Sequence, residues 1–377
     1  MNRRDRLMAT LRGETVDRPA VSFYEINGLD EKVEGDDPYN IYTHPSWKPL
    51  LDLAREKTDR IVMRGVPFIG APADPWQKFT TVETWIDQGS LYRKRTIRLG
   101  QKVLVEVTRQ DPNVNTIWQI EPLFRSPQDV LAFLNLPAPE FGGEPDIWRV
   151  LEAEDALGDT GIVMIDTPDP LCIAASLFEM GEYTVVATTE PALFQRLLEW
   201  FAAVLLPQTE AVAKALPGRL WRIYGPEYAS APYLHPHQFR EYVVRYDTPM
   251  VQSIQKYGGY ARLHSHGRLK NILDDIVSTG CSGLDPIEPP PQGDVDLAYV
   301  RQKYGRQLVL FGNLELSDIE MLPVDAFESK VLQALEQGTY GEGRGFVLMP
   351  SSCPYGRILA SQTLRNYEKI IEVVEKF

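Results

Sequence analysis

The chain has 377 residues, of which 44% are hydrophobic and 24% charged, and its 39 basic and 52 acidic side chains give a formal net charge of −13. This composition is typical of a globular protein and excludes global disorder. The acidic balance, without any block of Lys and Arg, argues against binding to nucleic acid or to an anionic membrane surface. No apolar stretch reaches the roughly 20 residues that a membrane helix needs.

Cysteine usage and the N-terminus indicate the expected compartment. Cys172, Cys281 and Cys353 are the three cysteines, and an odd, small number does not make a disulfide framework. The charged opening residues 1–6 are followed by no apolar signal core. We therefore expect a protein of the reducing cytoplasm.

After a basic opening helix at 3–11, short apolar runs alternate with longer amphipathic stretches. Strands are expected at 19–26, 60–66, 161–166, 220–227, 260–266, 282–287, 307–312 and 345–349. Helices are expected at 193–216, 236–257, 268–278, 297–304, 326–335 and 361–377. This alternation is typical of a parallel sheet covered on both faces. It predicts an α/β fold, a single (β/α)8 TIM barrel over residues 1–377. A doubly wound open sheet is the alternative, because an error of one in the number of strands would leave the two folds indistinguishable from the sequence.

The segment 76–123 interrupts this alternation. It is rich in Thr, Val, Trp and Tyr, and turn sequences stand at 87–89 and 111–113. These features predict a β-meander inserted after the second strand. Because the segment lacks enough apolar residues for a core of its own, we expect an elaboration of the barrel and not a second domain.

His264 and His266 are the sharpest candidates for chemistry. Residues i and i+2 on a strand project from one face, so both imidazoles can point at one spot at the end of the fifth strand, where barrel enzymes place their active sites. With Cys353 after the last strand they would make a three-ligand zinc site with an open position. The alternative is that the histidines only bind an anionic substrate. His235 and His237 repeat the spacing at a helix start, where they are expected to be a solvated cap.

Other polar side chains also follow the predicted strands. Asp166, Tyr224 and Glu227 are the expected catalytic group. Glu227 is expected to be a general base, a metal ligand or a hydrogen-bond acceptor, and the alternative is an ion pair with an arginine such as Arg222 or Arg262. Glu288 and Asn313 are expected to hold a cofactor, since an amide suits the orientation of a bound group. The alternative for Asp166 is a turn cap.

Several motifs resemble the uroporphyrinogen decarboxylase superfamily. They are Arg-Leu-His-Ser-His-Gly at 262–267, Asp-Pro-Ile-Glu-Pro-Pro-Pro-Gln-Gly-Asp at 285–294, Phe-Gly-Asn at 311–313 and Met-Pro-Ser-Ser at 349–352, with an opening resemblance at 2–7 and 17–19. The resemblance spans most of the chain and implies a (β/α)8 barrel. These motifs identify the superfamily, but they do not identify which reaction of the superfamily the chain would catalyse.

The superfamily has two branches. True decarboxylases carry an Arg-rich segment after the first strand, whereas residues 23–30 here contain no arginine. A pocket for a porphyrinogen with eight carboxylates needs cations, so this reaction is disfavoured. The corrinoid-dependent methyltransferases hold zinc with a His-x-Cys pair and a later Cys. His264, His266 and Cys353 match those positions, with His in place of Cys at 266, which makes the site less rich in thiolate.

The leading hypothesis is a methyltransferase that moves a methyl group between a corrinoid protein and a small acceptor at zinc. A homodimer is possible. The alternatives are a metal-free decarboxylase or lyase acting on a small acid, with Arg64, Asp166 and Tyr224 as substrate contacts, and a non-catalytic barrel that binds a ligand.

Overall fold

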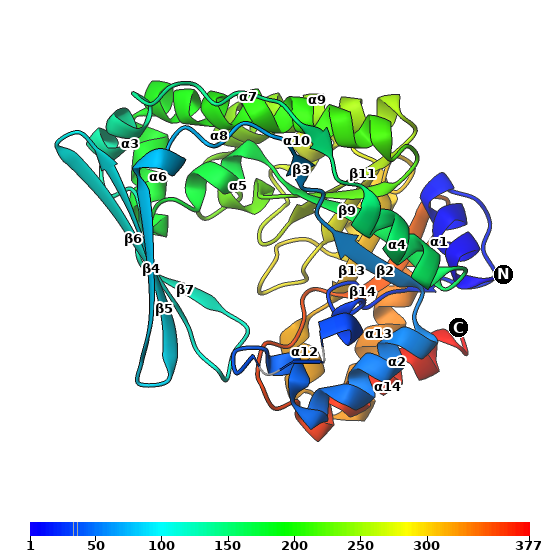
Figure 1. The fold of residues 1–377 in the computed structure, drawn as a ribbon. Helices are drawn as coiled ribbons and strands as arrows, with labels where there is room; N and C mark the ends of the chain where they lie inside the picture. Colours follow the sequence, from blue (N-terminus) through cyan, green and yellow to red (C-terminus); the bar gives the residue numbers. More distant parts are fainter. Residues whose placement is uncertain (33, 36) are drawn as a thin grey trace.

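In a computed structural model of the chain, which describes residues 1–32, 34–35 and 37–377, eight parallel strands form one curled sheet (Figure 1). Their order across the sheet is β1-β14-β13-β12-β11-β10-β9-β2. The predicted (β/α)8 barrel is confirmed, and all eight predicted strands are present. Their bounds are β1 Ala20–Val21, β2 Arg60–Arg64, β9 Gly161–Pro168, β10 Leu220–Tyr224, β11 Tyr260–Ser265, β12 Gly283–Pro286, β13 Val309–Leu314 and β14 Gly345–Pro350.

Helices connect successive strands and cover the outside of the barrel (Figure 1). Within the described ranges, none is long and apolar enough to cross a membrane. The helix α1 closes the N-terminal end of the barrel, where Leu7 and Leu11 pack among buried strand residues. The helices are α1 Arg3–Arg12, α2 Lys48–Lys57, α3 Pro127–Phe133, α4 Trp148–Leu157, α5 Pro170–Ala175, α6 Met180–Thr189, α7 Pro191–Ala215, α8 Pro236–Phe239, α9 Arg245–Lys256, α10 Leu273–Ser278, α11 Leu297–Tyr304, α12 Leu316–Met321, α13 Val324–Thr339 and α14 Ser361–Val374.

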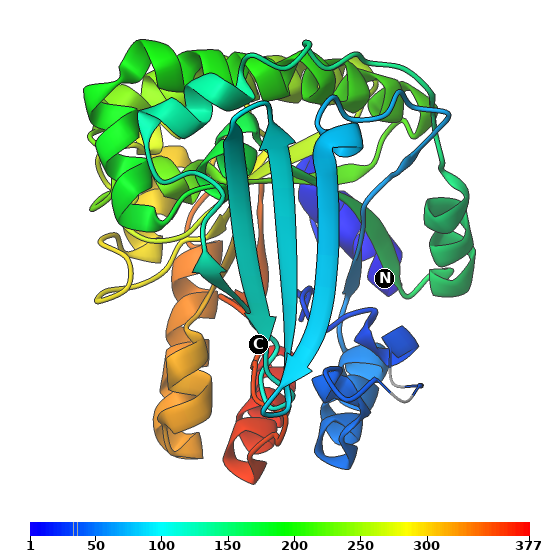
Figure 2. The ribbon, with the colours of Figure 1, turned by 60° about the vertical axis from the view of Figure 1, so that its left-hand side comes forward.

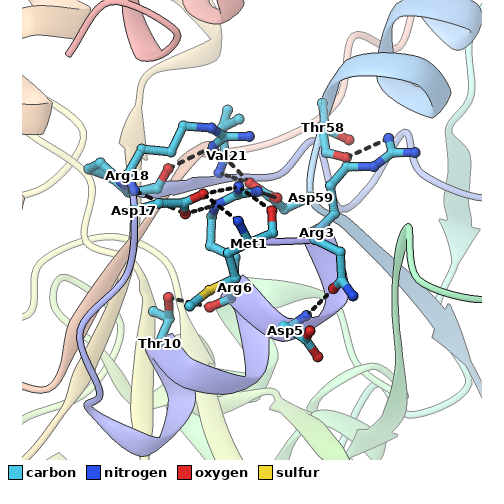
Figure 3. Close-up of polar contacts among 12 residues, drawn as sticks. Met1, Arg3, Asp5, Arg6, Thr10, Asp17, Arg18, Val21, Thr58 and Asp59 are labelled. Atoms are coloured by element: carbon cyan, nitrogen blue, oxygen red, sulfur yellow. Dashed lines mark hydrogen bonds and ion pairs between the residues drawn. The ribbon is translucent and has the colours of Figure 1, made fainter.

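The seam between β1 and β2 is closed by the side chain and backbone of Asp59. The Asp59 backbone N–H donates to Val21 O at 2.7 Å, and its carboxylate accepts from the Val21 N–H at 2.9 Å. The same buried carboxylate pairs with Arg6 at 2.5 Å and Arg18 at 3.0 Å (Figure 3). Asp17, half exposed, binds the other edge of the Arg6 guanidinium. Charged groups from the N-terminal segment therefore complete the barrel.

The predicted meander is confirmed as an antiparallel sheet inserted between β2 and β9. Its strands are β4 Thr80–Asp87, β5 Ser90–Leu99, β6 Lys102–Gln110 and β7 Ile117–Glu121, and a separate short pair, β3 Phe68–Ile69 with β8 Glu144–Pro145, flanks it. Ile97 and Leu104 are paired across β5 and β6 and are buried in the main core of the molecule. The insertion thus shares the core of the barrel.

The meander stands across the end of the barrel at which the strands finish, as Figure 2 shows. Near the end of the sheet formed by the β4–β5 turn and the β6–β7 loop, the Tyr39 hydroxyl donates to Gly89 O at 3.2 Å, and Asn115 N–H donates to Tyr355 O at 2.8 Å. From the short strand β7, the Gln119 side chain donates to Ser176 O beyond α5 at 2.9 Å. The inserted sheet is therefore fixed to segments that follow barrel strands.

Several predicted elements differ from the structure at their boundaries. The strand expected at 19–26 ends at Val21, because Ile26 and Asn27 donate back to Phe23 O and the chain turns there. The helix expected at 236–257 is continuous but contains a π-helical turn at Arg240–Val244. The helix expected at 268–278 begins only at Leu273. The first of these differences places Glu25 in a turn over the barrel mouth.

Candidate active site

The strand register places the predicted site residues at two levels of the barrel. Asp166, Arg222 and Arg262 are direct neighbours on β9, β10 and β11. One step nearer the C-terminal ends, Tyr224 is aligned with His264. Because the strands are parallel and in this register, side chains from separate segments of the chain meet inside the barrel mouth.

The deeper level is built around Arg222. Its guanidinium donates to both oxygens of Asp166 at 2.6 and 3.1 Å, and it lies 3.8 Å from Oε1 of Glu25. It also stands over the rings of Tyr24 and Tyr224, 5.7 and 5.1 Å from their centroids. The predicted catalytic residues Asp166 and Tyr224 are thus brought together around one cation. The Asp166 carboxylate is used in a bidentate ion pair.

A second chain of contacts joins Arg262, Asp285 and His264. Asp285 has one oxygen 2.8 Å from Arg262 Nε and the other 2.7 Å from His264 Nδ1, and Arg262 and Asp285 have no exposed side-chain surface. The Arg262 guanidinium also lies 4.7 and 4.9 Å from the ring centroids of Tyr24 and Phe311. Burial alone raises the pKa of Asp285, but Arg262 and His264 hold it below its ordinary value. Asp285 is therefore an anion that fixes the His264 ring.

His266 has a carboxylate partner of the same kind. Its Nδ1 lies 2.8 Å from Glu288 Oε1, while Glu288 Oε2 accepts from the Gly267 N–H at 2.7 Å. Burial lowers the pKa of His266, but the hydrogen bond and charge of Glu288 outweigh it and raise the pKa to about 9. The ring centroids of His264 and His266 are 4.7 Å apart, and the two ring planes are nearly perpendicular. The two imidazoles therefore form one pair, each held at Nδ1 by an acid.

This pair fits a zinc ion. Metal-binding histidines commonly donate one ring N–H to a carboxylate, which fixes the ring and leaves the other nitrogen for the metal. Asp285 and Glu288 make that contact at Nδ1 of His264 and His266, so Nε2 of each ring would face the ion. The donor set also suits zinc, which readily accepts imidazole nitrogen.

In the structure, Cys353 contacts groups other than the two histidines. Its backbone N–H donates to Glu25 Oε2 at 2.7 Å, and its thiol contacts the carbonyl of Pro354 at 3.4 Å. Burial and the nearby Glu25 raise the pKa of the Cys353 thiol well above its ordinary value. Across the part of the chain that the structure describes, no three or more His, Cys, Asp or Glu side chains are grouped to hold a metal ion. The zinc ion stays a prediction.

Glu227 lies in a short helical turn after β10, at Pro226–Ala229. Its Oε2 accepts from the Gly225 N–H at 3.1 Å. Among the described residues, the two arginines considered as partners of Glu227 are bound elsewhere: Arg222 pairs with Asp166 and Arg262 with Asp285. Glu227 therefore stays a candidate base.

The two predicted cofactor residues follow neighbouring strands, β12 and β13. The Asn313 amide donates to Ile287 O at 3.2 Å. Glu288 is bound to His266, so its clearest role is to orient that ring. That both residues hold a cofactor stays a prediction.

The residues expected to hold a small acid in the lyase alternative are used inside the protein. Arg64 Nη2 donates to both oxygens of Glu31 at 2.6 Å. Asp166 and Tyr224 both surround Arg222. A substrate carboxylate would have to break these ion pairs, so the geometry argues against this alternative.

The second His-x-His pair is a helix cap, as predicted. His235 is the N-cap of α8, its ring accepts from the His237 N–H at 3.3 Å, and the two Nδ1 atoms are 2.8 Å apart. The Gln238 side chain accepts from the His235 N–H and completes a capping box. The pair therefore has a local structural role.

Sequence reasoning missed the part that Arg262 and Tyr24 play in the site. Arg262 precedes His264 by two residues on the same strand, so the alternation that singled out the histidines also places this arginine inside the barrel. Tyr24 lies in the turn that replaces the second half of the first predicted strand, and its hydroxyl donates to Glu25. No sequence pattern indicated that turn.

Comparison with known proteins places this geometry in context. A methyltransferase from Methanosarcina mazei superposes with a TM-score of 0.62, covering 100% of this chain and 99% of that chain at 18% sequence identity. At this identity the similarity shows the fold. A D-psicose 3-epimerase matches 60% of this chain and 82% of its own at 10% identity, with a TM-score of 0.32 that is too low to bear on this chain. The sequence matches no curated protein.

The model of one protein family, uroporphyrinogen decarboxylase (URO-D), matches residues 162–377. The match covers more than half of the chain and includes both histidines of the pair, their two acids and Cys353. It begins within β9, so the meander lies outside it. The strand-end site and the barrel that carries it are therefore those of a member of the uroporphyrinogen decarboxylase family, to which this chain belongs.

Proposed function

We propose that the chain is a methyltransferase that moves a methyl group between a corrinoid carried by a partner protein and a small acceptor, at a zinc ion bound by His264, His266 and Cys353. The observation that carries this proposal is the histidine pair, in which each Nδ1 is held by a carboxylate and each Nε2 would face a metal. The fold shared with a methyltransferase supports it.

The charge of the mouth supports transfer of a neutral group. Arg222 and Arg262, two cations inside the barrel, are each bound to an aspartate. A poly-carboxylate substrate would therefore meet acids without a matching cation from these two residues. A small acceptor without carboxylates needs no such partner.

The roles of the chain's own residues follow from their contacts. Asp285 and Glu288 hold the two imidazoles in fixed orientations, so the rings do not need to reorganise during the reaction. Bound zinc would lower the pKa of an acceptor thiol or hydroxyl and keep it as a nucleophile. Glu227, beside the mouth, would accept the proton that the acceptor releases.

The first test is the metal content of protein purified without chelator, by plasma mass spectrometry. About one zinc ion per chain is expected in the wild type, and a loss of that zinc in His266→Ala. His237→Ala is the matched control, because it removes a histidine of the same spacing that has a capping role, and it should keep the zinc. A wild type without zinc would overturn the metal site.

A second measurement tests the reaction. Methylcobalamin is mixed with the protein and a panel of small thiols, amines and alcohols, and loss of its methyl group is followed by absorbance. We expect turnover with at least one acceptor in the wild type and in His237→Ala, and a drop of about 100-fold or more in His266→Ala. Zinc binding without turnover by any acceptor would contradict methyl transfer from a corrinoid.

A further inference from the structure

The meander touches the loop that carries Cys353. We define the meander tip as residues 111–116, between β6 and β7, and the Cys353 loop as residues 351–360, between β14 and α14. The Asn115 N–H donates to Tyr355 O, and the Arg357 N–H donates to Asn113 O, each at 2.8 Å. These bonds flank an antiparallel bridge between Val114 and Gly356. The tip is therefore joined to the Cys353 loop by main-chain pairing.

Two side chains reinforce this pairing. The Arg357 guanidinium donates from Nη1 to Pro112 O at 3.0 Å and to Pro38 O at 2.9 Å. The Asn115 amide donates to the Tyr42 hydroxyl at 2.8 Å. Arg357 and Asn115 thus connect the meander tip, the Cys353 loop and the segment after β1, which meet beneath the inserted sheet in Figure 2.

The other end of the loop is fixed at the barrel mouth. The Cys353 N–H donates to Glu25 Oε2, and Glu25 in turn accepts from the Tyr24 hydroxyl at 3.1 Å. Only four peptide steps separate Cys353 from Arg357. A short segment held at both ends has few conformations, so the contacts at Arg357 restrict where the Cys353 thiol can lie.

We propose that Asn115 and Arg357 are positioning residues for Cys353, and that the meander exists in this chain to hold the Cys353 loop against the barrel mouth. The inference deepens the proposed function, because it matters for methyl transfer only if Cys353 is a zinc ligand. The thiol need not be locked in its present contact with Pro354 O, since the main-chain clamp sets the position of the loop and leaves the side chain to turn.

The first experiment needs no metal. In metal-free protein at fixed pH, the rate at which Cys353 reacts with N-ethylmaleimide is measured by peptide mass spectrometry. The variant Asn115→Ala/Arg357→Ala loses three side-chain hydrogen bonds, so the buried thiol should react about tenfold faster or more. Gln119→Ala is the matched control, since it removes the contact of the same sheet with Ser176 O and leaves the tip intact. Its rate should equal that of the wild type.

A spectroscopic readout separates positioning from general loosening. In protein loaded with Co²⁺, a bound Cys353 thiolate gives a sulfur-to-cobalt charge-transfer band. We expect this band to weaken in Asn115→Ala/Arg357→Ala and to be partly restored in Asn115→Ala/Arg357→Lys, because lysine keeps a charged donor that can reach one of the two carbonyls. Far-UV circular dichroism checks that each variant is folded.

Each outcome decides one question. An unchanged maleimide rate in folded Asn115→Ala/Arg357→Ala overturns the positioning role, and if that variant does not fold, the single change Arg357→Lys gives the same decision. If Cys353 reacts faster in Asn115→Ala/Arg357→Ala but the wild type binds neither Zn²⁺ nor Co²⁺, then the two residues do restrict the Cys353 loop and the proposed zinc methyltransferase is rejected. A faster rate with an unaltered cobalt band shows that the clamp covers the thiol without positioning it for metal, which rejects the inference.

Discussion

Asp285 binds two cationic or polar partners at once, and it does so where no water reaches. It pairs with Arg262 through one oxygen and with His264 through the other, and neither Arg262 nor Asp285 has exposed side-chain surface. A buried ion pair contributes little net stability when intact, yet removal of one member leaves an unpaired buried charge. Asp285 is therefore important both for stability and for the orientation of the histidine.

This arrangement predicts a large effect from Asp285→Asn. The free energy of unfolding should fall by about 3 to 5 kcal/mol, because Arg262 would be left charged and without its anion. Urea denaturation measures the change. Asp166→Asn is the matched control, since it breaks the neighbouring but partly exposed pair with Arg222 and should cost less. Equal losses in the two variants would contradict the role given to burial.

The sequence was sufficient to find the histidine pair and insufficient to find what holds it. The His-x-His spacing on an apolar strand needs only the two-residue alternation of a strand. The pairing of His264 with Asp285 depends on the register between β11 and β12, which sequence alone does not determine. The turn that brings Glu25 to Cys353 likewise depends on contacts made by residues more than 300 positions away.

Two buried aspartates link helices on the outside of the barrel. Asp169 is the N-cap of α5 and Asp247 lies within α9, and both are fully buried. Among the described residues, neither oxygen of Asp247 meets a hydrogen-bond donor, and neither does Oδ2 of Asp169. The pKa of Asp169 is raised well above its ordinary value, mainly by burial and secondly by the charge of Asp247. The pKa of Asp247 is raised in the same way, mainly by burial and secondly by the charge of Glu227. Both carboxyls are therefore expected to bind a proton on folding.

The raised pKa values predict a pH dependence of stability. An unfolded aspartate has a pKa of about 3.9, so the bound protons stabilise the fold fully below that pH, and this stabilisation is lost as the pH rises through the folded-state values. The free energy of unfolding of the wild type should therefore fall as the pH rises above about 4. In Asp247→Asn, which cannot ionise, the fall should be smaller.

Urea denaturation at several pH values tests this difference. Asp155→Asn removes an exposed carboxyl on α4 and should follow the wild-type curve. Parallel curves for Asp247→Asn and the wild type would show that the two carboxyls do not bind a proton on folding.

At the level of elements, the alternation of apolar runs and amphipathic stretches was enough to place every barrel strand. The positions of element ends were less certain, because they depend on tertiary contacts. The first strand is cut short by a turn at Phe23, and α10 begins five residues after the start of its amphipathic stretch, because Ile272 N–H donates to Leu269 O in a preceding turn. The meander was recognisable from its composition, but nothing in its sequence indicated that its tip would pair with the loop after β14.

The barrel as a whole is completed by side chains at its seam. Asp59 is fully buried and accepts from Arg6, Arg18 and the Val21 N–H. It joins α1, β1 and the start of β2. Loss of this carboxylate should open the seam while the other strand pairs remain.

Asp59→Asn tests this expectation. The free energy of unfolding should fall by about 3 to 5 kcal/mol, since two arginines lose their buried anion. Hydrogen exchange measured by mass spectrometry should rise first in peptides that cover β1 and β2. Asp17→Asn removes the half-exposed partner of Arg6 and should have a smaller effect. Uniformly faster exchange over all eight strands would contradict a local role at the seam.

The pairing of β1 with β14 has a consequence for how the protein is made. Ala20 pairs with Val347 and Val21 with Leu348, so the first strand cannot find its neighbour until nearly the whole chain has left the ribosome. At typical rates of synthesis this delay is on the order of tens of seconds. During that time the apolar side of α1, with Leu7 and Leu11, has no barrel to close. The earliest part of the chain to be synthesised is thus among the last to reach its final place.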